Sequence, residues 1–260
     1  MPFSPKDLED LRYAKSLLEN PSLGAKISNI IGFPIEKGFE LLPAKWSELI
    51  SNATRESLEK ALDVSVRTMG AHAPRPSANL MHKIIAAATG AGGGAFGFPA
   101  LPVELPISTM VILRSIADIA RSEGELITSP EAKLACIEVF ALGGRSRSDD
   151  AATTGYFQVR AALAKVVSEA AQYIAERGLA EESAPAIVRL IAQVASRFSV
   201  SVSQKVAAQV IPIVGAAGGA LVNLVFIDHF QDVGRGHFIV RRLERTYSAD
   251  DVRRAYDRLP

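Results

Sequence analysis

The sequence predicts an all-α protein, a helical bundle with two glycine-rich central helical segments. No stretch alternates apolar and polar residues for long enough to predict a β-strand, and apolar residues recur at helical spacing along most of the chain. Two glycine cores are nearly identical. Residues 90–95 read GAGGGA and residues 215–220 read GAAGGA, so five of six positions agree at a separation of 125 residues. This likeness suggests an internal pseudo-repeat.

The overall composition excludes several classes of protein. The chain has 29 basic and 28 acidic residues, a net charge of +1, so no strong overall charge attracts nucleic acid or anionic lipid. Aromatic residues make up 7%, too few for an obvious base-stacking surface, and no nucleic-acid partner is expected. The single cysteine, Cys136, excludes an internal disulfide and reads as a small buried side chain. The N-terminus lacks a secretory signal pattern, which predicts a cytoplasmic protein.

The first helix is predicted from its start signal. Ser4 is a suitable N-cap, Pro5 suits the first helical position, and Asp7 follows three residues after the cap. This helix extends to about Asn20. Glycines and prolines interrupt the next stretch, which reads as short helical turns or a covering loop. The sequence therefore divides into an N-terminal helix and covering segment over residues 1–42 and a helical domain over residues 43–260.

The middle of the chain predicts three helices. Residues 43–69 combine one apolar face with one charged face, and Gly70 ends that helix. Residues 77–98 are rich in small side chains and read as a second helix. A third helix is predicted over residues 108–123. The residues expected to force a turn before it are Pro99, Pro102 and Pro106.

Five helices are predicted in the rest of the chain. Ser129 and Pro130 begin one helix in the same way as Ser4 and Pro5, and Gly143-Gly144 ends it. Residues 145–154 read as a polar loop. Three amphipathic helices and a short terminal helix, which starts at a capping box over 248–251, are then predicted over residues 156–177, 184–208, 228–247 and 249–259.

The glycine cores predict close contacts between helices. A glycine inside a helix costs on the order of 1 kcal/mol relative to alanine. Glycines at GxxxG spacing offset this cost when another helix backbone approaches where a side chain would clash. The glycines expected to make such helix contacts are Gly90, Gly93, Gly94, Gly97, Gly215, Gly218 and Gly219.

The same two segments leave open whether the chain meets a membrane. Residues 206–227 carry no formal charge over 22 residues, and as one helix they would be ~33 Å long, enough to cross a bilayer. Residues 84–103 are also uncharged. The first segment is mostly Ala and Gly, however, and the second contains Gln209, Pro212 and Asn223, without basic flanks. The alternatives are a buried central hairpin, which is favoured, and a hairpin that touches or enters the bilayer.

One cluster has the composition of a metal site. His229 and His237 lie on the same predicted helix as two aspartates, after the second glycine core. Glu104 lies at the equivalent place after the first glycine core and is a further possible ligand. The two histidines are eight residues apart with two glycines between them, which is not a known ligand spacing. The favoured interpretation is a polar cluster at the start of a helix. The metal alternative uses Glu104, Asp228, His229, Asp232 and His237.

Other chemical signatures are missing from the sequence. The run GAGGGAFG over residues 90–97 is not a phosphate-binding loop, because no Lys and Ser or Thr follow it at the needed place. No GxSxG motif is present, and no cofactor is indicated. Arginines between residues 241 and 258 alternate with acidic residues and are interpreted as an ion-paired surface.

Several motifs together resemble the bacterial EcsC-like family. They are the GAGGGAFG run, CIEVFALGG over residues 136–144, GYFQVRAAL over residues 155–163, and IPIVGAAGGALVN followed by HFQDVGRGHFIVRRLERTY towards the C-terminus. The resemblance covers roughly residues 42–256. The family is named for a gene beside an ABC-transporter ATPase and its membrane subunit. It implies a cytoplasmic helical protein that is associated with a membrane, and it supplies no catalytic residues.

The leading functional hypothesis is a non-enzymatic cytoplasmic helical protein. It is expected to lie peripherally on the inner face of the cell membrane or on a membrane-transport complex. In one variant of the hypothesis it also binds a lipid or another small apolar ligand. The alternative is a metal-dependent hydrolase that uses the C-terminal Asp/His cluster. A purely structural interaction module is the third reading.

Overall fold

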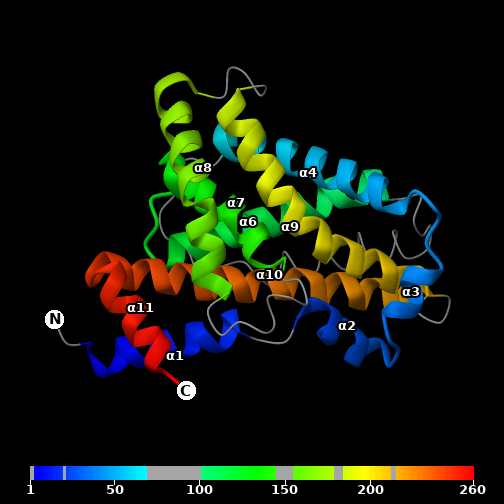
Figure 1. The fold of residues 1–260 in the computed structure, drawn as a ribbon, viewed down its shortest axis with the longest axis horizontal. Helices are drawn as coiled ribbons and strands as arrows, with labels where there is room; N and C mark the ends of the chain where they lie inside the picture. The colour runs from blue at the N-terminus through cyan, green and yellow to red at the C-terminus, as the bar shows by residue number, and fades with distance from the viewer. Residues whose placement is uncertain (1–2, 20–21, 69–100, 145–154, 179–183, 212–214) are drawn as a thin grey trace.

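The computed structural model describes residues 3–19, 22–68, 101–144, 155–178, 184–211 and 215–260. Within these ranges the chain forms ten helices and no strand, which confirms the all-α fold class (Figure 1). The helices are α1 (Pro5–Leu18), α2 (Leu23–Ile31), α3 (Glu36–Glu40), α4 (Trp46–Thr68), α6 (Leu101–Ser122), α7 (Pro130–Leu142), α8 (Gly155–Arg177), α9 (Pro185–Gln209), α10 (Gly215–Thr246) and α11 (Ala249–Arg258).

Three helices begin at the serines that the sequence indicates. The hydroxyl of Ser4 accepts a hydrogen bond from the backbone N–H of Asp7 at 3.1 Å, and Ser129 and Ser248 cap α7 and α11 in the same way. Each hydroxyl satisfies a backbone donor that has no partner within the first turn. These helix starts are local properties of the sequence, which explains why the predictions are confirmed.

Helix α6 begins earlier than predicted. It starts at Leu101 rather than at residue 108, so Pro102 and Pro106 lie inside the helix and do not force a turn before it. Pro102 is in the first turn, where a backbone N–H has no helical partner in any case. Pro106 removes one hydrogen bond, to the carbonyl of Pro102. The expected turn was wrong because Pro102 costs little in the first turn and the cost of Pro106 is offset by the packing of α6, which buries 13 of its residues.

The second glycine-rich segment does not form one helix. Helix α9 ends at Gln209, and α10 begins at Gly215 and continues to Thr246, past the predicted boundary at residue 228. The stretch expected to be short helical turns or a covering loop contains two short helices, α2 and α3, which agrees with the first alternative. The predicted helix over residues 77–98 and the predicted loop over residues 145–154 lie outside the described residues.

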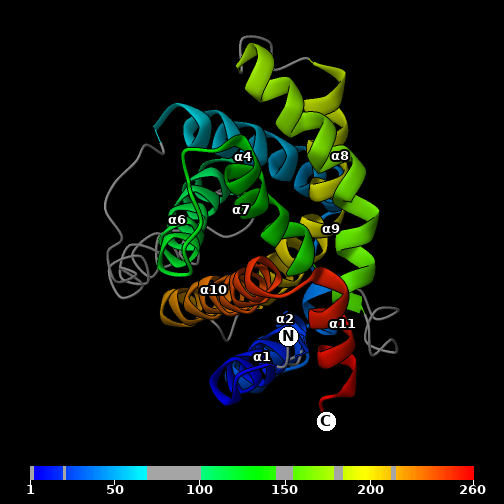
Figure 2. The same cartoon turned by 90° about the vertical axis from the view of Figure 1, so that its left-hand side faces the viewer.

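Helix α10 is the axis of the fold. Its 32 residues correspond to a length of about 48 Å. It packs against α1, α2, α6, α7, α9 and α11. Figures 1 and 2 show α1 and α2 on one side of this helix and α4, α6, α7 and α9 on the other. The helices far apart in sequence therefore meet along α10.

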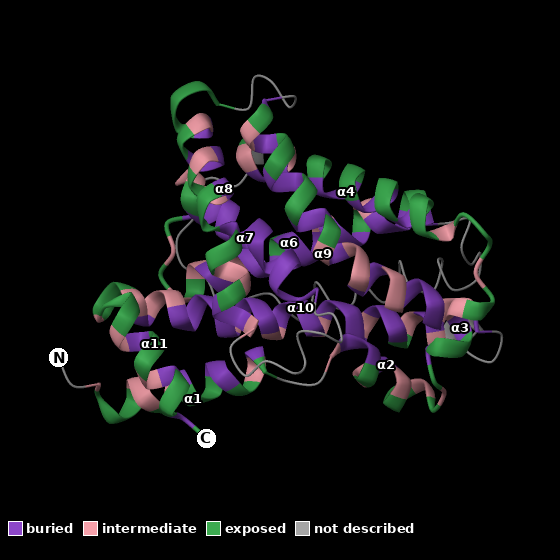
Figure 3. Ribbon diagram, viewed as in Figure 1, coloured by how far each residue is buried: buried purple, intermediate pink, exposed green. Residues whose placement is uncertain are grey.

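Helix α7 lies in the interior of the group of helices α4, α6, α7 and α9 on one side of α10. Every residue from Ala132 to Leu142 is buried, as expected of a helix that is covered all round (Figure 3). Cys136 is among them, and burial raises the pKa of its thiol to about 12, so it is an inert core residue as predicted. Four aromatic rings from α7, α9 and α10 contact one another at the centre: Phe140, Phe198, Phe226 and Phe230.

The N-terminal segment shares this core. Leu11, Ala14 and Leu18 of α1 are buried against α10, and they belong to the same hydrophobic cluster as the rest of the chain. The Lys15 ammonium donates hydrogen bonds to the carbonyl oxygens of Tyr256 and Leu259, at 3.3 and 2.6 Å. The two ends of the chain are therefore joined on one face of α10.

Candidate functional site

A buried ion pair joins three helices near the glycine-rich segments. The Lys205 ammonium of α9 lies 2.5 Å from a carboxylate oxygen of Glu104 in α6, and the exposed fractions of the two side chains are 0% and 7%. The Ser108 hydroxyl donates to the same oxygen at 3.1 Å. The ring of Phe226 in α10 lies 4.8 Å from the ammonium. Burying two charges is costly, so removing either partner would leave the other charge uncompensated.

The helices α6 and α10, which contribute Glu104 and Phe226 to this site, also carry three exposed apolar side chains. Val103 and Ile107, one turn apart on α6, are 69% and 44% exposed, and Leu221 near the start of α10 is 49% exposed. Glu104 and Ser108, which follow Val103 and Ile107 directly, are buried, and so is Asn223, two residues after Leu221. We call this region the inverted end, defined by Val103, Glu104, Ile107, Ser108, Lys205, Leu221 and Asn223.

The inverted end departs from the usual arrangement of a water-soluble helix at a few positions of α6, while neighbouring apolar residues such as Leu101 and Leu105 are buried in the ordinary way. Helices at a water surface place charges outside and apolar residues inside. Here α6 directs Glu104 and Ser108 inward while Val103 and Ile107 face out. Charged residues that face the bundle interior and apolar residues that face outward are typical of helices in an apolar environment. Single exposed apolar residues are common, so the combination with the buried charges is the informative feature.

The glycines predicted to make helix contacts are placed only in part. Gly215 begins α10, Gly218 is half-buried and Gly219 is buried. The glycines of the first core, Gly90, Gly93, Gly94 and Gly97, lie outside the described residues. Their predicted contacts stay a prediction.

Close glycine contacts occur at positions that the sequence analysis missed. A Cβ atom added at Gly38 would overlap the backbone of Ala207, and one at Gly144 would overlap the backbone of Arg197. Gly144 follows a helix end, and so it reads from sequence only as a terminator. Neither glycine has another glycine four residues away, so no GxxxG spacing marks it, and its contact partner is distant in sequence.

The five residues of the metal alternative do not assemble. Glu104 binds Lys205, whereas Asp232 accepts a hydrogen bond from Lys26 at 3.1 Å. His229 Nε2 lies 2.8 Å from the carbonyl oxygen of Gly143, and His237 Nδ1 lies 3.0 Å from the Tyr156 hydroxyl. The described part of the chain, which contains all five, holds no group of three or more His, Cys, Asp or Glu side chains placed to bind a metal. Asp228 lies on the same helix and joins no such group.

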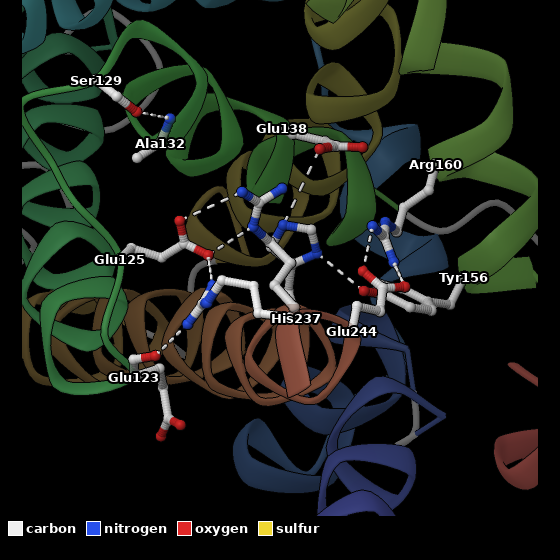
Figure 4. A network of polar contacts seen from close by, with 11 residues as sticks. Glu123, Glu125, Ser129, Ala132, Glu138, Tyr156, Arg160, His237 and Glu244 are labelled. Carbon is white, nitrogen blue, oxygen red and sulfur yellow. Dashed lines mark hydrogen bonds and ion pairs between the residues drawn. The ribbon is translucent and has the colours of Figure 1, made fainter. Parts of the chain in front are cut away.

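His237 belongs to a buried network with Tyr156 of α8 and Glu138 of α7, and its Nε2 lies 4.0 Å from Glu138 (Figure 4). Burial lowers the pKa of His237 well below 6.5, so the ring is neutral at pH 7. Burial also raises the pKa of Tyr156, so its hydroxyl keeps its proton at pH 7. The guanidinium group of Arg160 lies over the Tyr156 ring, 5.4 Å from its centre. The Tyr156 hydroxyl and His237 Nδ1 share one hydrogen bond, and Nε2 is the ring nitrogen that faces Glu138.

Arginines surround the network, and acidic residues on α10 and in the connection between α6 and α7 bind them. Arg160 binds Glu244 through two hydrogen bonds of 2.8 and 2.9 Å, and Arg241 binds Glu125 at 2.8 and 3.3 Å. Arg245 also binds Glu125. The expected ion pairing of these arginines is thus present among the described residues, but the partners of Arg241 and Arg245 come from a segment 116 or more residues away.

The model of the EcsC protein family matches residues 11–243 of this chain. The chain belongs to the EcsC protein family. The match includes α1 from Leu11 onward, so the EcsC region begins about thirty residues earlier than the sequence motifs indicate. It also includes the inverted end and the His237 network. No curated protein and no solved structure gives a significant match.

Proposed function

We propose that this EcsC-family protein is a non-enzymatic helical protein of the cytoplasm that docks on the inner face of the cell membrane through its inverted end. The observation that carries the proposal is the outward position of Val103, Ile107 and Leu221 beside the buried pair of Glu104 and Lys205. Insertion of these apolar side chains at the headgroup boundary would remove them from water, at about 25 cal/mol per Å² of apolar surface.

The positions of the two uncharged stretches of sequence support docking through the inverted end. Residues 84–103 end at this surface, and residues 206–227 include Leu221. Figure 1 places the C-terminal end of α9 and the N-terminal end of α10 on the same side of the molecule. A membrane-transport complex, which the family resemblance implies, would meet the chain at this membrane surface.

Peripheral docking fits the fold better than a span. Among the described helices, α9 alone is long and apolar enough to cross a membrane, and 44% of its apolar window is buried inside the protein. It packs against α2, α4, α7, α8 and α10. Extracting α9 into a bilayer would break these contacts, whereas docking by the inverted end leaves them intact.

Flotation with liposomes tests the proposal. The full chain, purified without detergent, is expected to float with both neutral and anionic vesicles, because the proposed contact is apolar. The double variant V103E/I107E places charges in the contact and should reduce the floated fraction about tenfold or more. The matched control is V188E, because Val188 is an exposed apolar residue (48%) near the other end of α9.

Equal flotation of V103E/I107E and V188E would contradict docking by this end. Wild-type protein that stays unbound to both kinds of vesicle would reject the membrane proposal altogether. Lipid extraction and mass spectrometry of the same preparation test the variant in which the protein also carries a small apolar ligand.

A further inference from the structure

A cavity of about 360 Å³ opens beside the His237 network and is separate from the inverted end. Its walls come from α7, α8, α10 and α11, and we call it the Glu138 pocket. Its volume falls within the range of small-molecule sites. The polar lining residues are Glu138, Arg160, Arg241, Glu244, Asp250 and Arg253, and apolar walls are formed by Phe157, Ala161, Ala164 and Val167.

The innermost polar group of the pocket is the carboxyl group of Glu138. This residue is only 6% exposed. Within the described ranges its one polar contact is the His237 Nε2 atom at 4.0 Å, which is too long for a hydrogen bond. The carboxyl group lines the cavity and is not sealed in the core, so a group placed in the cavity can reach it. No described side chain donates a hydrogen bond to it within ordinary distance. A carboxyl group that faces a cavity without a partner is therefore placed to receive a ligand.

The charges around Glu138 restrict the ligand group that can reach it. The guanidinium groups of Arg160 and Arg241 line the same space, held in place by Glu244 and Glu125. They would repel an ammonium group placed at the bottom of the pocket. A neutral hydroxyl group can donate a hydrogen bond to Glu138 without that repulsion.

The mouth of the pocket contains an arginine that can bind an anion. Arg253 is exposed, stacks over the ring of Phe157 at 5.7 Å, and makes no ion pair with any described residue. The stacking holds its guanidinium group at the mouth. Asp250, one turn earlier on α11, also lines the mouth and would repel a doubly charged phosphate. A single carboxylate suits Arg253 best.

We propose that the Glu138 pocket binds a small carboxylic acid that also carries a neutral hydroxyl group. The carboxylate lies on Arg253, the hydroxyl group donates to Glu138, and the carbon chain between them lies along Phe157, Ala161 and Val167. This site is independent of the membrane proposal, because it shares no residue with the inverted end.

Isothermal titration of the full-length protein with a matched series of acids tests the site. The probes are ω-hydroxy acids of about four to eight carbons and the unsubstituted acids of the same lengths, a range that fits a pocket of this size. At least one hydroxy acid should bind about tenfold more tightly than its parent acid, the difference expected of one hydrogen bond. The variant E138L should remove this preference, so that both acids bind alike.

The mouth is tested with a pair of neighbouring arginines. R253Q should weaken the binding of both acids about tenfold. R254Q is the matched control, because Arg254 is also exposed but pairs with Asp251 and does not line the pocket. Three outcomes would overturn the proposal: no saturable binding of any probe up to about 10 mM, equal binding of hydroxy and parent acids, or equal losses in R253Q and R254Q.

Discussion

Lys205 and Glu138 are both buried ionisable side chains, and the protein accommodates them in two different ways. Lys205 is fully buried but lies 2.5 Å from Glu104, so its charge is compensated by an ion pair. Glu138 has no such partner among the described residues, and burial raises its pKa to about 7 despite the opposing fields of Arg160 and Arg241. The first arrangement fixes the packing of three helices. The second leaves a carboxyl group free to bind.

The raised pKa of Glu138 predicts a pH-dependent stability. The ordinary pKa is 4.5, and the folded value is about 7, so between these values the folded protein binds a proton that the unfolded chain has lost. The free energy of unfolding therefore falls as pH rises through this window. The variant E138Q lacks this loss and should be more stable than wild type by about 1 to 3 kcal/mol at pH 8, with little difference at pH 4.

Denaturant unfolding of both proteins across pH 4 to 8 measures this difference. His237 gives the opposite slope, because its lowered pKa makes the folded state lose stability as pH falls below 6.5. Because His237 lowers the stability only below pH 6.5, the comparison at pH 8 isolates the effect of Glu138. A constant difference across this pH range would show that Glu138 titrates normally.

At the scale of elements, α10 depends on how closely α1 approaches it. A Cβ atom added at Gly236 would lie 2.7 Å from Cγ of Leu18 and 3.0 Å from the carbonyl oxygen of Ala14. At Gly234, two residues earlier, the nearest atom is Ile116 Cγ1 at 3.5 Å, an ordinary contact. One glycine of the pair is required by packing, and the other is not.

Two alanine substitutions should therefore have opposite effects. G236A forces α1 away from α10 and should destabilise the protein by about 1 to 3 kcal/mol through overpacking. G234A should be neutral or stabilise it by up to about 1 kcal/mol, because alanine favours a helix interior. Thermal unfolding of the two variants beside wild type measures both effects. A similar loss of stability in both would mean that α1 does not pack on α10 at this distance.

At the scale of the whole molecule, the N-terminal segment is part of the single core. Its buried side chains include Leu11, Leu18, Leu23 and Ile27, and Arg242 of α10 binds Asp10 of α1 at 2.7 Å. Burial of each such apolar side chain contributes about 1.5 to 3 kcal/mol. The sum for these four is comparable with the whole stability of a typical domain, about 5 to 15 kcal/mol.

A chain that lacks residues 1–42 is therefore expected to lose cooperative folding, although the sequence marks residue 43 as a domain start. Circular dichroism and a thermal melt of residues 43–260 beside the full chain measure this. A cooperative transition near that of the full chain would show that residues 43–260 form an independent domain.

The sequence by itself determined the features that depend on neighbouring residues. Ser4, Ser129 and Ser248 predict helix starts because a cap needs only the next three residues, and the absence of period-two alternation predicts an all-α fold. The family also follows from the order of motifs. The His/Asp composition around residues 228–237 left a polar cluster and a metal site as alternatives, because composition alone does not say where side chains point. In the structure His229 and His237 contact Gly143 and Tyr156.

Only the tertiary structure decided what distant residues do together. Glu104 meets Lys205 across 101 residues, and Tyr156 meets His237 across 81. Local periodicity carries no information about such pairs. The inward direction of Glu104 and the cavity beside Glu138 arise where separate helices pack, because burial and charge compensation are properties of the assembled core.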